Sequence, residues 1–149
     1  MKLGEYLKED FVLAGLETTA KADVLAELVA PVGRLVSGFD AEKALAVLTE
    51  RERLGTTGIG DGVAIPHGKL EGLDEIILVV GRSSQGVDFE ALDFKPCFIF
   101  FLVLAPEQVA GMHLRILAHI SRLLKDEGFR KTFMEAPDKE TLWNLLSRA

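Results

Sequence analysis

Residues 51–69 read RERLGTTGIGDGVAIPHGK, and this stretch combines a glycine-rich loop with one of only three histidines in the chain. The apolar residues 63–65 predict a short buried strand, and Pro66 should end it because proline fixes one backbone angle and has no N–H. Gly68 permits backbone conformations that are closed to other residues and leaves its own N–H accessible. The stretch therefore predicts a rigid support for the imidazole of His67 at the end of a strand, where functional groups are often carried.

An imidazole held in this way has the properties of a nucleophile. At its unperturbed pKa of about 6.5 the ring is mostly neutral near pH 7, so one ring nitrogen is free to attack an electrophile. If the electrophile were phosphorus, the ring would gain a group with about −1.5 to −2 charges, which backbone amides and a guanidinium would have to hold. The candidates near His67 are the side chains of Arg51 and Arg53 and the loop amides of Gly55, Thr56, Thr57 and Gly58.

Each of these features also has a plain structural interpretation. A histidine beside a proline in a turn is, taken alone, more often an exposed loop residue, and glycines commonly mark turns. Arg51 and Arg53 are equally consistent with a solvated helix end, where cations suit the helix dipole. The loop lacks the GxxxxGK[ST] spacing of a nucleotide-binding P-loop. On local chemistry alone, His67 is therefore a candidate and no more.

Length and composition restrict the fold and the class of function. At 149 residues, with 48% hydrophobic and 27% charged residues, the chain fits one ordered domain spanning 1–149. The longest apolar run, Cys97 to Ala105, is far shorter than the roughly 20 residues of a membrane-spanning helix, so we expect a buried strand and no membrane insertion. A net charge of −6 argues against a sequence-independent nucleic-acid binder. The absence of a signal-peptide pattern and the single cysteine lead us to expect a cytoplasmic protein.

Hydrophobic spacing along the chain predicts helices around a group of strands. A first helix should have Thr18 or Thr19 as its N-cap and should end or kink at Pro31, and a second should run from the N-cap Asp40 to about residue 51 or 53. Two of the expected strands are continuous apolar runs, which suit a sheet covered on both faces. We therefore predict an α/β domain with helices flanking the sheet. The remaining expected elements are strands at 63–66, 76–81 and 97–104 and helices at 112–125, 128–135 and after Asp138.

The two other histidines test whether the chain holds a metal ion instead. His113 and His119 lie six residues apart on the expected helix 112–125, so their rings point about 120° apart at 3.6 residues per turn. The sequence has no HxxxH or CxxC pair. His113 falls at the start of the apolar stripe, which is more typical of a core-edge residue, and His119 falls near arginines on the surface side. We therefore expect no metal site and no cofactor.

Taken together, RERLGTTGIGDGVAIPHGK resembles the signature of the enzyme IIA domains of the bacterial phosphoenolpyruvate:sugar phosphotransferase system (PTS), in the fructose/mannitol branch that includes the nitrogen-regulatory IIA proteins. Arg-Glu, Leu-Gly, a Thr-Gly-Ile-Gly loop and Ala-Ile-Pro-His-Gly all occur here in one spacing. The run FFLVLAPEQVAGMHLRILAHISRLL at 100–124 resembles the second region of the family. The resemblance implies the type-2 IIA fold, a mixed β-sheet flanked by helices on both faces.

The resemblance also implies a role for each residue of the candidate site. His67 would accept a phosphoryl group from the histidine-containing phosphocarrier protein, Arg51 would pair with the phosphoryl oxygens, and His113 would be the second histidine beside the active ring. Glu52 would have only a structural or orienting role. The phosphoryl-binding loop would comprise Thr56, Thr57, Gly58 and Gly68.

The acceptor of the phosphoryl group distinguishes two functions. A nitrogen-regulatory IIA protein acts through phosphorylation-dependent protein binding, whereas a sugar-specific component passes the group to an enzyme IIB for uptake of a fructose- or mannitol-type sugar. We expect the regulatory function, because no IIB, IIC or phosphocarrier module is fused to this chain. A degenerate domain that only binds partners would lack His67 or Arg51, and both are present. For docking of the donor, Leu54 and Ile59 either rim a patch beside the site or belong to the core.

Overall fold

A six-stranded mixed sheet forms the centre of the computed structural model, which describes residues 1–149 with the side chain of Ala110 left out. The strands are β1 Leu7–Leu13, β2 Gly58–Gly60, β3 Val63–Ala64, β4 His67–Lys69, β5 Ile77–Val87 and β6 Cys97–Ala105. The helices are the 3-10 helix η1 Leu3–Glu5 and the α-helices α1 Lys21–Leu35, α2 Ala41–Arg53, α3 Ala110–Lys125, α4 Glu127–Glu135 and α5 Lys139–Ser147.

The long strands β5 and β6 pair antiparallel in the middle of the sheet, in the order β1-β5-β6-β3-β2. β1 runs parallel to β5, and both β3 and β4 run parallel to β6. β6 has the sequence CFIFFLVLA, and all of its residues except Phe98 are buried, because both faces of the sheet are covered there. β6 therefore provides the rigid support for the short strands that precede and include His67.

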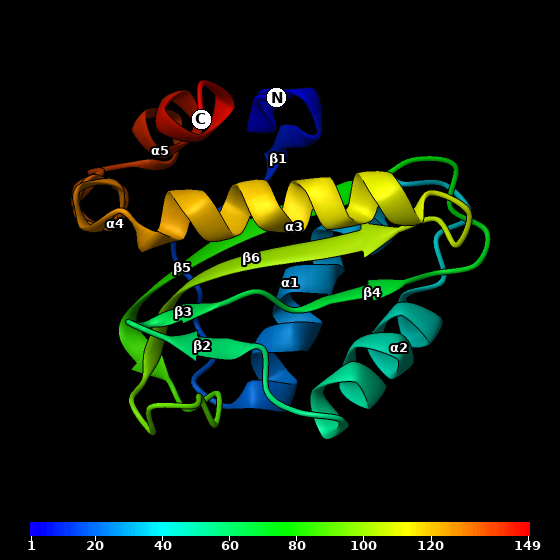
Figure 1. Ribbon diagram of the computed structural model, residues 1–149, viewed down its shortest axis with the longest axis horizontal. Coiled ribbons are helices and arrows are strands. Elements are labelled where there is room, and N and C mark those ends of the chain that lie inside the picture. Colours follow the sequence, from blue (N-terminus) through cyan, green and yellow to red (C-terminus); the bar gives the residue numbers. More distant parts are fainter.

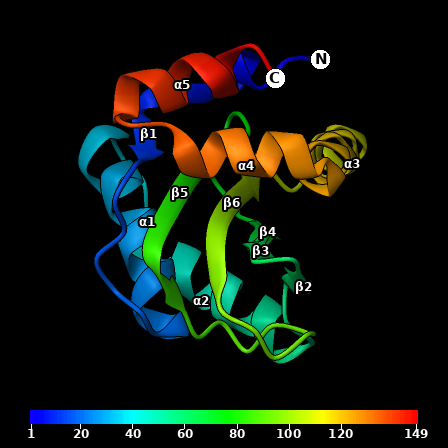
Figure 2. The same cartoon turned by 90° about the vertical axis from the view of Figure 1, so that its left-hand side faces the viewer.

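Helices cover the sheet on both faces. α1 and α2 pack together on one face, and α3 crosses the other (Figure 1). The view turned by 90° shows α1 and α3 on opposite sides of β5 and β6, with α5 beside β1 and η1 (Figure 2). The expected α/β fold with a mixed sheet and helices on both faces is confirmed.

The N-terminal helix differs from its prediction at its start, and of the two alternatives given for Pro31 it does not take the earlier end. α1 begins after Ala20, which has no side-chain cap, and the hydroxyl of Thr18 instead donates to the carboxylate of Glu27 at 2.7 Å. Pro31 does not end the helix, which continues to Leu35. Proline removes one hydrogen bond from a helix, but Pro31 is buried on the face of α1 that packs against the core, and this packing offsets the loss. By contrast, Asp40 caps α2 as predicted, because its carboxylate accepts from the N–H of Lys43 at 3.1 Å.

Two predicted strands have different bounds in the structure, and β1 was not predicted, because the partner strands decide where each strand begins and ends. The expected strand at 63–66 contains only the two residues of β3, and His67 begins a separate strand, β4, rather than following one. β5 continues beyond residue 81 to Val87, because β6 pairs with Arg82 and again with Val87, on either side of an irregularity in the register. β1 was not predicted, since its sequence LKEDFVL lacks regular alternation and is a strand only because β5 lies beside it.

Candidate active site

His67 lies opposite Val103 of the central strand β6. Its ring Nδ1 is 2.7 Å from the backbone carbonyl oxygen of Ile65. Because a carbonyl oxygen can only accept, Nδ1 carries the ring proton and donates it to this oxygen. Nε2 therefore keeps its lone pair, and it is the atom from which the neutral imidazole can attack an electrophile.

His113 lies beside His67 although the two residues belong to different elements. α3 carries His113 across the sheet and brings the two ring centroids to 5.8 Å, with the ring planes at 84°. His113 is only 5% exposed, and its Nε2 has no hydrogen-bond partner among the described residues. An unpaired buried polar atom is costly and calls for a functional explanation. The pair of rings thus offers one nucleophilic nitrogen and one unpaired nitrogen next to it.

Both histidines are neutral near pH 7. Burial lowers the pKa of His67 below the ordinary value of 6.5; the hydrogen bond to Ile65 opposes this, and the charge of Arg51 adds to it. Burial also lowers the pKa of His113, and positive charge on His67 or Lys69 lowers it further. A neutral His67 is the form that can act as a nucleophile.

Arg51 lies in the last turn of α2 and reaches the same pocket. Its Nη1 donates to the carbonyl oxygen of Gly55 at 2.8 Å, and within the described part of the chain its other N–H groups have no protein acceptor. The other candidate, Arg53, is exposed and pairs with Glu50 at 3.2 Å. The pocket, called the His67 pocket below, has a volume of about 590 Å³ and is lined by Lys43, Ala46, Val47, Glu50, Arg51, Leu54, His67, Gly68, Lys69 and His113.

A buried carboxylate organises the loop between α2 and β2. Glu52 accepts from the N–H of Thr57 at 2.9 Å with one oxygen and from the hydroxyl of Thr57 with the other. The N–H of Gly58 donates to the hydroxyl oxygen of Thr56 at 3.1 Å, and this hydroxyl donates to the carbonyl of Phe89 at 3.3 Å. These loop donors, which the sequence offered for phosphoryl binding, are thus engaged within the protein.

Gly68 serves close packing rather than an unusual backbone conformation. It does not belong to the glycines with positive φ, and it pairs as a regular strand residue with Leu104. A Cβ atom at this position would lie 2.6 Å from Cγ1 of Val47 on α2. The expectation that Gly68 supplies conformational freedom was therefore wrong, and its missing side chain instead lets α2 approach β4.

The two apolar residues beside the loop are exposed rather than part of the core. Leu54 is 80% exposed and lines the His67 pocket, and Ile59 on β2 is 49% exposed. Leu114, which follows His113 on α3, is 68% exposed. Of these three, Leu54 lines the pocket, and an exposed apolar side chain at a pocket is typical of surfaces that dock another protein.

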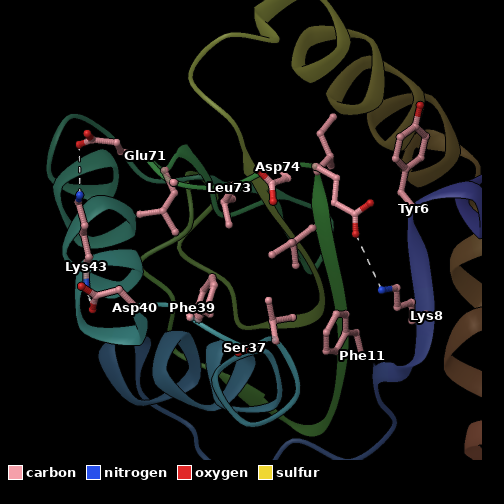
Figure 3. Close-up of a pocket in the computed structure, with 17 residues that line it drawn as sticks. Tyr6, Lys8, Phe11, Ser37, Phe39, Asp40, Lys43, Glu71, Leu73 and Asp74 are labelled. Carbon is pink, nitrogen blue, oxygen red and sulfur yellow. Dashed lines mark hydrogen bonds and ion pairs between the residues drawn. The ribbon is translucent and has the colours of Figure 1, made fainter.

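A second hollow of about 450 Å³ lies between β1, the turn from α1 to α2, and the segment between β4 and β5 (Figure 3). We call it the β1 hollow. Apolar side chains such as Phe11, Phe39 and Leu73 line its interior. Its lysines are paired at the rim, Lys43 with Glu71 at 3.3 Å and Lys8 with Glu75 at 3.9 Å, and no histidine lines it.

The remaining histidine and the acidic residues form no further centre. His119 lies outside the His67 pocket, and its Nε2 is 3.0 Å from the carbonyl oxygen of Ala149. Among the described residues, no three His, Cys, Asp or Glu side chains are grouped so that they could hold a metal ion. Within the part of the chain that the structure describes, no helix has the length and apolar character needed to cross a bilayer.

Comparison with known proteins places this chain in a family. The family model described as "Phosphoenolpyruvate-dependent sugar phosphotransferase system, EIIA 2" matches residues 5–149. The chain belongs to this family. It is a phosphotransferase of the PTS that acts through a phosphohistidine, and the assignment made from residues 51–69 is confirmed.

Individual relatives of this EIIA 2 chain have regulatory and sugar-specific names. A nitrogen regulatory protein from Bradyrhizobium diazoefficiens is 37% identical over 147 residues, covering 99% of this chain and 95% of the relative. A fructose-specific EIIA component from Haloferax volcanii is 37% identical over 125 residues, covering 84% and 79%. The structure of the nitrogen regulatory protein IIA-Ntr from Neisseria meningitidis matches with a TM-score of 0.90 and 30% identity, covering 97% of this chain and 98% of that one.

The surroundings of the EIIA 2 site include one residue that the sequence analysis missed. Lys21, the first residue of α1, places its ammonium 2.9 Å from the buried carboxylate of Glu52. A cation is unfavourable at a helix N-terminus, so the position of Lys21 was a weak sign of an acidic partner. Only the packing of α1 against α2 identifies that partner.

Proposed function

We propose that His67 carries the phosphoryl group and that its Nε2 forms the bond to phosphorus. The observation that carries this proposal is the 2.7 Å contact between Nδ1 and the carbonyl oxygen of Ile65. This contact holds the ring proton on Nδ1 and leaves Nε2 as the nucleophile of a ring that lines an open pocket.

The reaction exchanges a phosphoryl group between two histidines. The lone pair of Nε2 forms a bond to phosphorus while the P–N bond of the donor phosphohistidine breaks, and the electron pair of that bond stays on the donor ring nitrogen. His67 then has substituents on both ring nitrogens and gains positive charge. The carbonyl oxygen of Ile65, which still accepts from Nδ1, stabilises this charge.

Arg51 and His113 hold the phosphoryl oxygens in this proposal. The guanidinium of Arg51 is always protonated, so its hydrogen bonds to a phosphoryl group are charge-assisted. His113 is neutral, and its unpaired Nε2 donates when it carries the ring proton. The N–H groups of Thr57 and Gly58 are engaged within the protein, so we assign to these residues and to the Thr56 hydroxyl the shaping of the loop around Arg51. Gly68 allows the close packing of α2 against β4.

We further propose that the protein is a nitrogen-regulatory IIA protein. It receives its phosphoryl group from the histidine-containing phosphocarrier protein in the cytoplasm, and its phosphorylation state controls binding to other proteins. The likeness to nitrogen regulatory proteins over nearly the whole length of both chains supports this role. Leu54, exposed at the edge of the His67 pocket, supplies an apolar contact for the docking donor.

A sugar-specific role is the second candidate, and one comparison favours it. The fructose-specific EIIA component from Haloferax volcanii is as similar to this chain in identity as the regulatory relative, although over a shorter stretch. In this role the acceptor is an enzyme IIB, and the phosphoryl group passes on to a sugar.

Intact-protein mass spectrometry tests the carrier function directly. The protein is incubated with phosphoenolpyruvate, enzyme I and the phosphocarrier protein, and its mass is measured at neutral or alkaline pH, where phosphohistidine survives. We expect a gain of one phosphate that is lost in acid and absent from His67→Ala. His119→Ala is the matched control and should gain the phosphate normally. Normal phosphorylation of a folded His67→Ala would disprove the assignment.

Whether the phosphoryl group on the protein passes to an enzyme IIB distinguishes the regulatory role from the sugar-specific role. Purified phosphoprotein is mixed with a fructose-type or a mannitol-type enzyme IIB, and the remaining phosphate is followed over time. Retention of the phosphate with both acceptors is expected of the regulatory protein. Rapid transfer to either one would establish the sugar-specific role instead.

A further inference from the structure

We infer that Lys21 is a positioning residue for phosphoryl transfer, and that it acts through Glu52 on the loop that contacts Arg51. This inference rests on the proposed role of His67 and Arg51. Lys21 is not among the residues that line the His67 pocket, so it has no direct contact with a phosphoryl group there. Its effect has to pass through the groups that it holds in place.

The ammonium of Lys21 contacts residues from three segments of the chain: the end of α2, the loop that follows it, and the segment between β5 and β6. It lies 2.9 Å from the carboxylate of Glu52, 3.5 Å from the hydroxyl of Thr56 and 3.8 Å from the carboxylate of Glu90. It also lies 4.7 Å from the ring centroid of Phe89, within cation–π range. The Lys21 side chain is only 17% exposed, and that of Glu52 is 5% exposed. This ion pair is therefore largely withdrawn from water, unlike the exposed pairs of the β1 hollow.

Glu52 transmits this contact to the loop. The oxygen that meets Lys21 also accepts from the backbone N–H of Thr57, and the other oxygen accepts from its hydroxyl. The same loop presents the carbonyl of Gly55 to the guanidinium of Arg51 at 2.8 Å. Glu52 and Arg51 are neighbours in the last turn of α2, so a shift of this turn or of the loop displaces Arg51 relative to His67.

The burial of the pair explains why Lys21 matters. A buried carboxylate that loses its counter-charge has to move toward water or give up its hydrogen bonds, because an unpaired buried charge is strongly unfavourable. Either change releases Thr57 and with it the loop that contacts Arg51. Phosphoryl transfer depends on exact placement of the groups that hold the developing charge, so a small displacement of Arg51 slows the reaction.

Transfer kinetics of three Lys21 variants test this inference. Phosphorylation of the full chain by the phosphorylated phosphocarrier protein is followed by rapid quench over a range of donor concentrations. We expect Lys21→Met to lower the maximal rate by about 10- to 100-fold, with the donor concentration at half-maximal rate unchanged. Lys21→Arg, which keeps the charge, should recover most of the rate. Lys8→Met, which breaks an exposed ion pair far from the loop, is the matched control and should transfer normally.

A double-mutant cycle identifies the route of the effect. If Lys21 acts through Glu52, then Lys21→Met combined with Glu52→Gln should be no slower than Glu52→Gln alone. If the fold-losses of rate of the two single variants multiplied in the double variant, Lys21 would act by another route. A wild-type rate in Lys21→Met would overturn the inference. If both Lys21→Met and Lys21→Arg failed to fold even at low temperature, Lys21 would be required for folding itself, and the positioning role would be overturned. Failure of the wild-type protein to accept phosphate would instead refute the function assigned to His67.

Discussion

The His67 pocket and the β1 hollow are similar in size, about 590 and 450 Å³, and Lys43 lines both, but they differ in the pairing of their other polar groups. In the β1 hollow, Lys43 and Lys8 are paired with carboxylates at the exposed rim. In the His67 pocket, Nε2 of His113 is buried without a partner, and Arg51 has free N–H groups among the described residues. The proposed site therefore differs from the β1 hollow in polar groups that are left unpaired and available to a reacting group, rather than in volume.

Among the residues around His67, the largest effect is expected at Arg51, whose guanidinium has N–H groups without an acceptor among the described residues. Arg51→Gln should slow phosphorylation of His67 by about 100-fold, because a preorganised charged donor to the phosphoryl oxygens is lost. Rapid-quench transfer kinetics measure this effect. Lys8→Met removes a cation from the β1 hollow and should leave the rate unchanged. Equal rates in Arg51→Gln and the wild type would remove Arg51 from the site.

His113 should show a smaller loss of rate together with a gain in stability. His113→Phe removes the unpaired Nε2, so we expect the unphosphorylated protein to be as stable or more stable in urea unfolding. Transfer to His67 should nevertheless slow by about tenfold, because a neutral donor to the phosphoryl group is lost. A variant that is destabilised and transfers normally would show that His113 is an ordinary core residue.

Gly68 tests whether the floor of the His67 pocket depends on packing. Gly68→Ala should lower the free energy of unfolding by about 1–3 kcal/mol, since the new Cβ overlaps Cγ1 of Val47. Adding Val47→Ala should restore much of this loss by removing that atom. Urea denaturation of the single and double variants measures both effects. Gly68→Ala with unchanged stability would contradict the close approach of α2 to β4.

The smallest expected effect is the pH dependence of stability. Burial lowers the pKa of His67 and His113 from 6.5 in the folded protein, so the unfolded chain binds protons first as the pH falls. The free energy of unfolding should therefore decrease as the pH drops below about 6.5. Urea titrations between pH 7.5 and 5.5 measure this slope. The slope should be shallower in His113→Phe, and an equal slope would show that His113 does not contribute.

The sequence predicted well where the deciding interactions are local. Asp40 and Asp138 were recognised as caps, because a side chain that accepts from an N–H three residues ahead needs no distant partner. It failed at the start of α1, where Ala20 rather than Thr18 or Thr19 is the N-cap, and at β1, which needs β5 beside it. At the site, His67, Arg51 and His113 were named, yet the engagement of Thr57 and Gly58 within the protein was not foreseen.

By itself, the sequence determined the family and supplied the residue to which we assign the chemistry, because a contiguous motif places His67 between Pro66 and Gly68 behind the loop. Only the tertiary structure decided that Nδ1 of His67 contacts a backbone carbonyl and that the ring centroids of His67 and His113 lie 5.8 Å apart. The ion pair between Lys21 and Glu52 also depends on the tertiary structure. The physical reason is distance along the chain. His113 and Lys21 reach the site through the packing of α3 and α1, and no local pattern encodes how far apart two helices lie once they are packed.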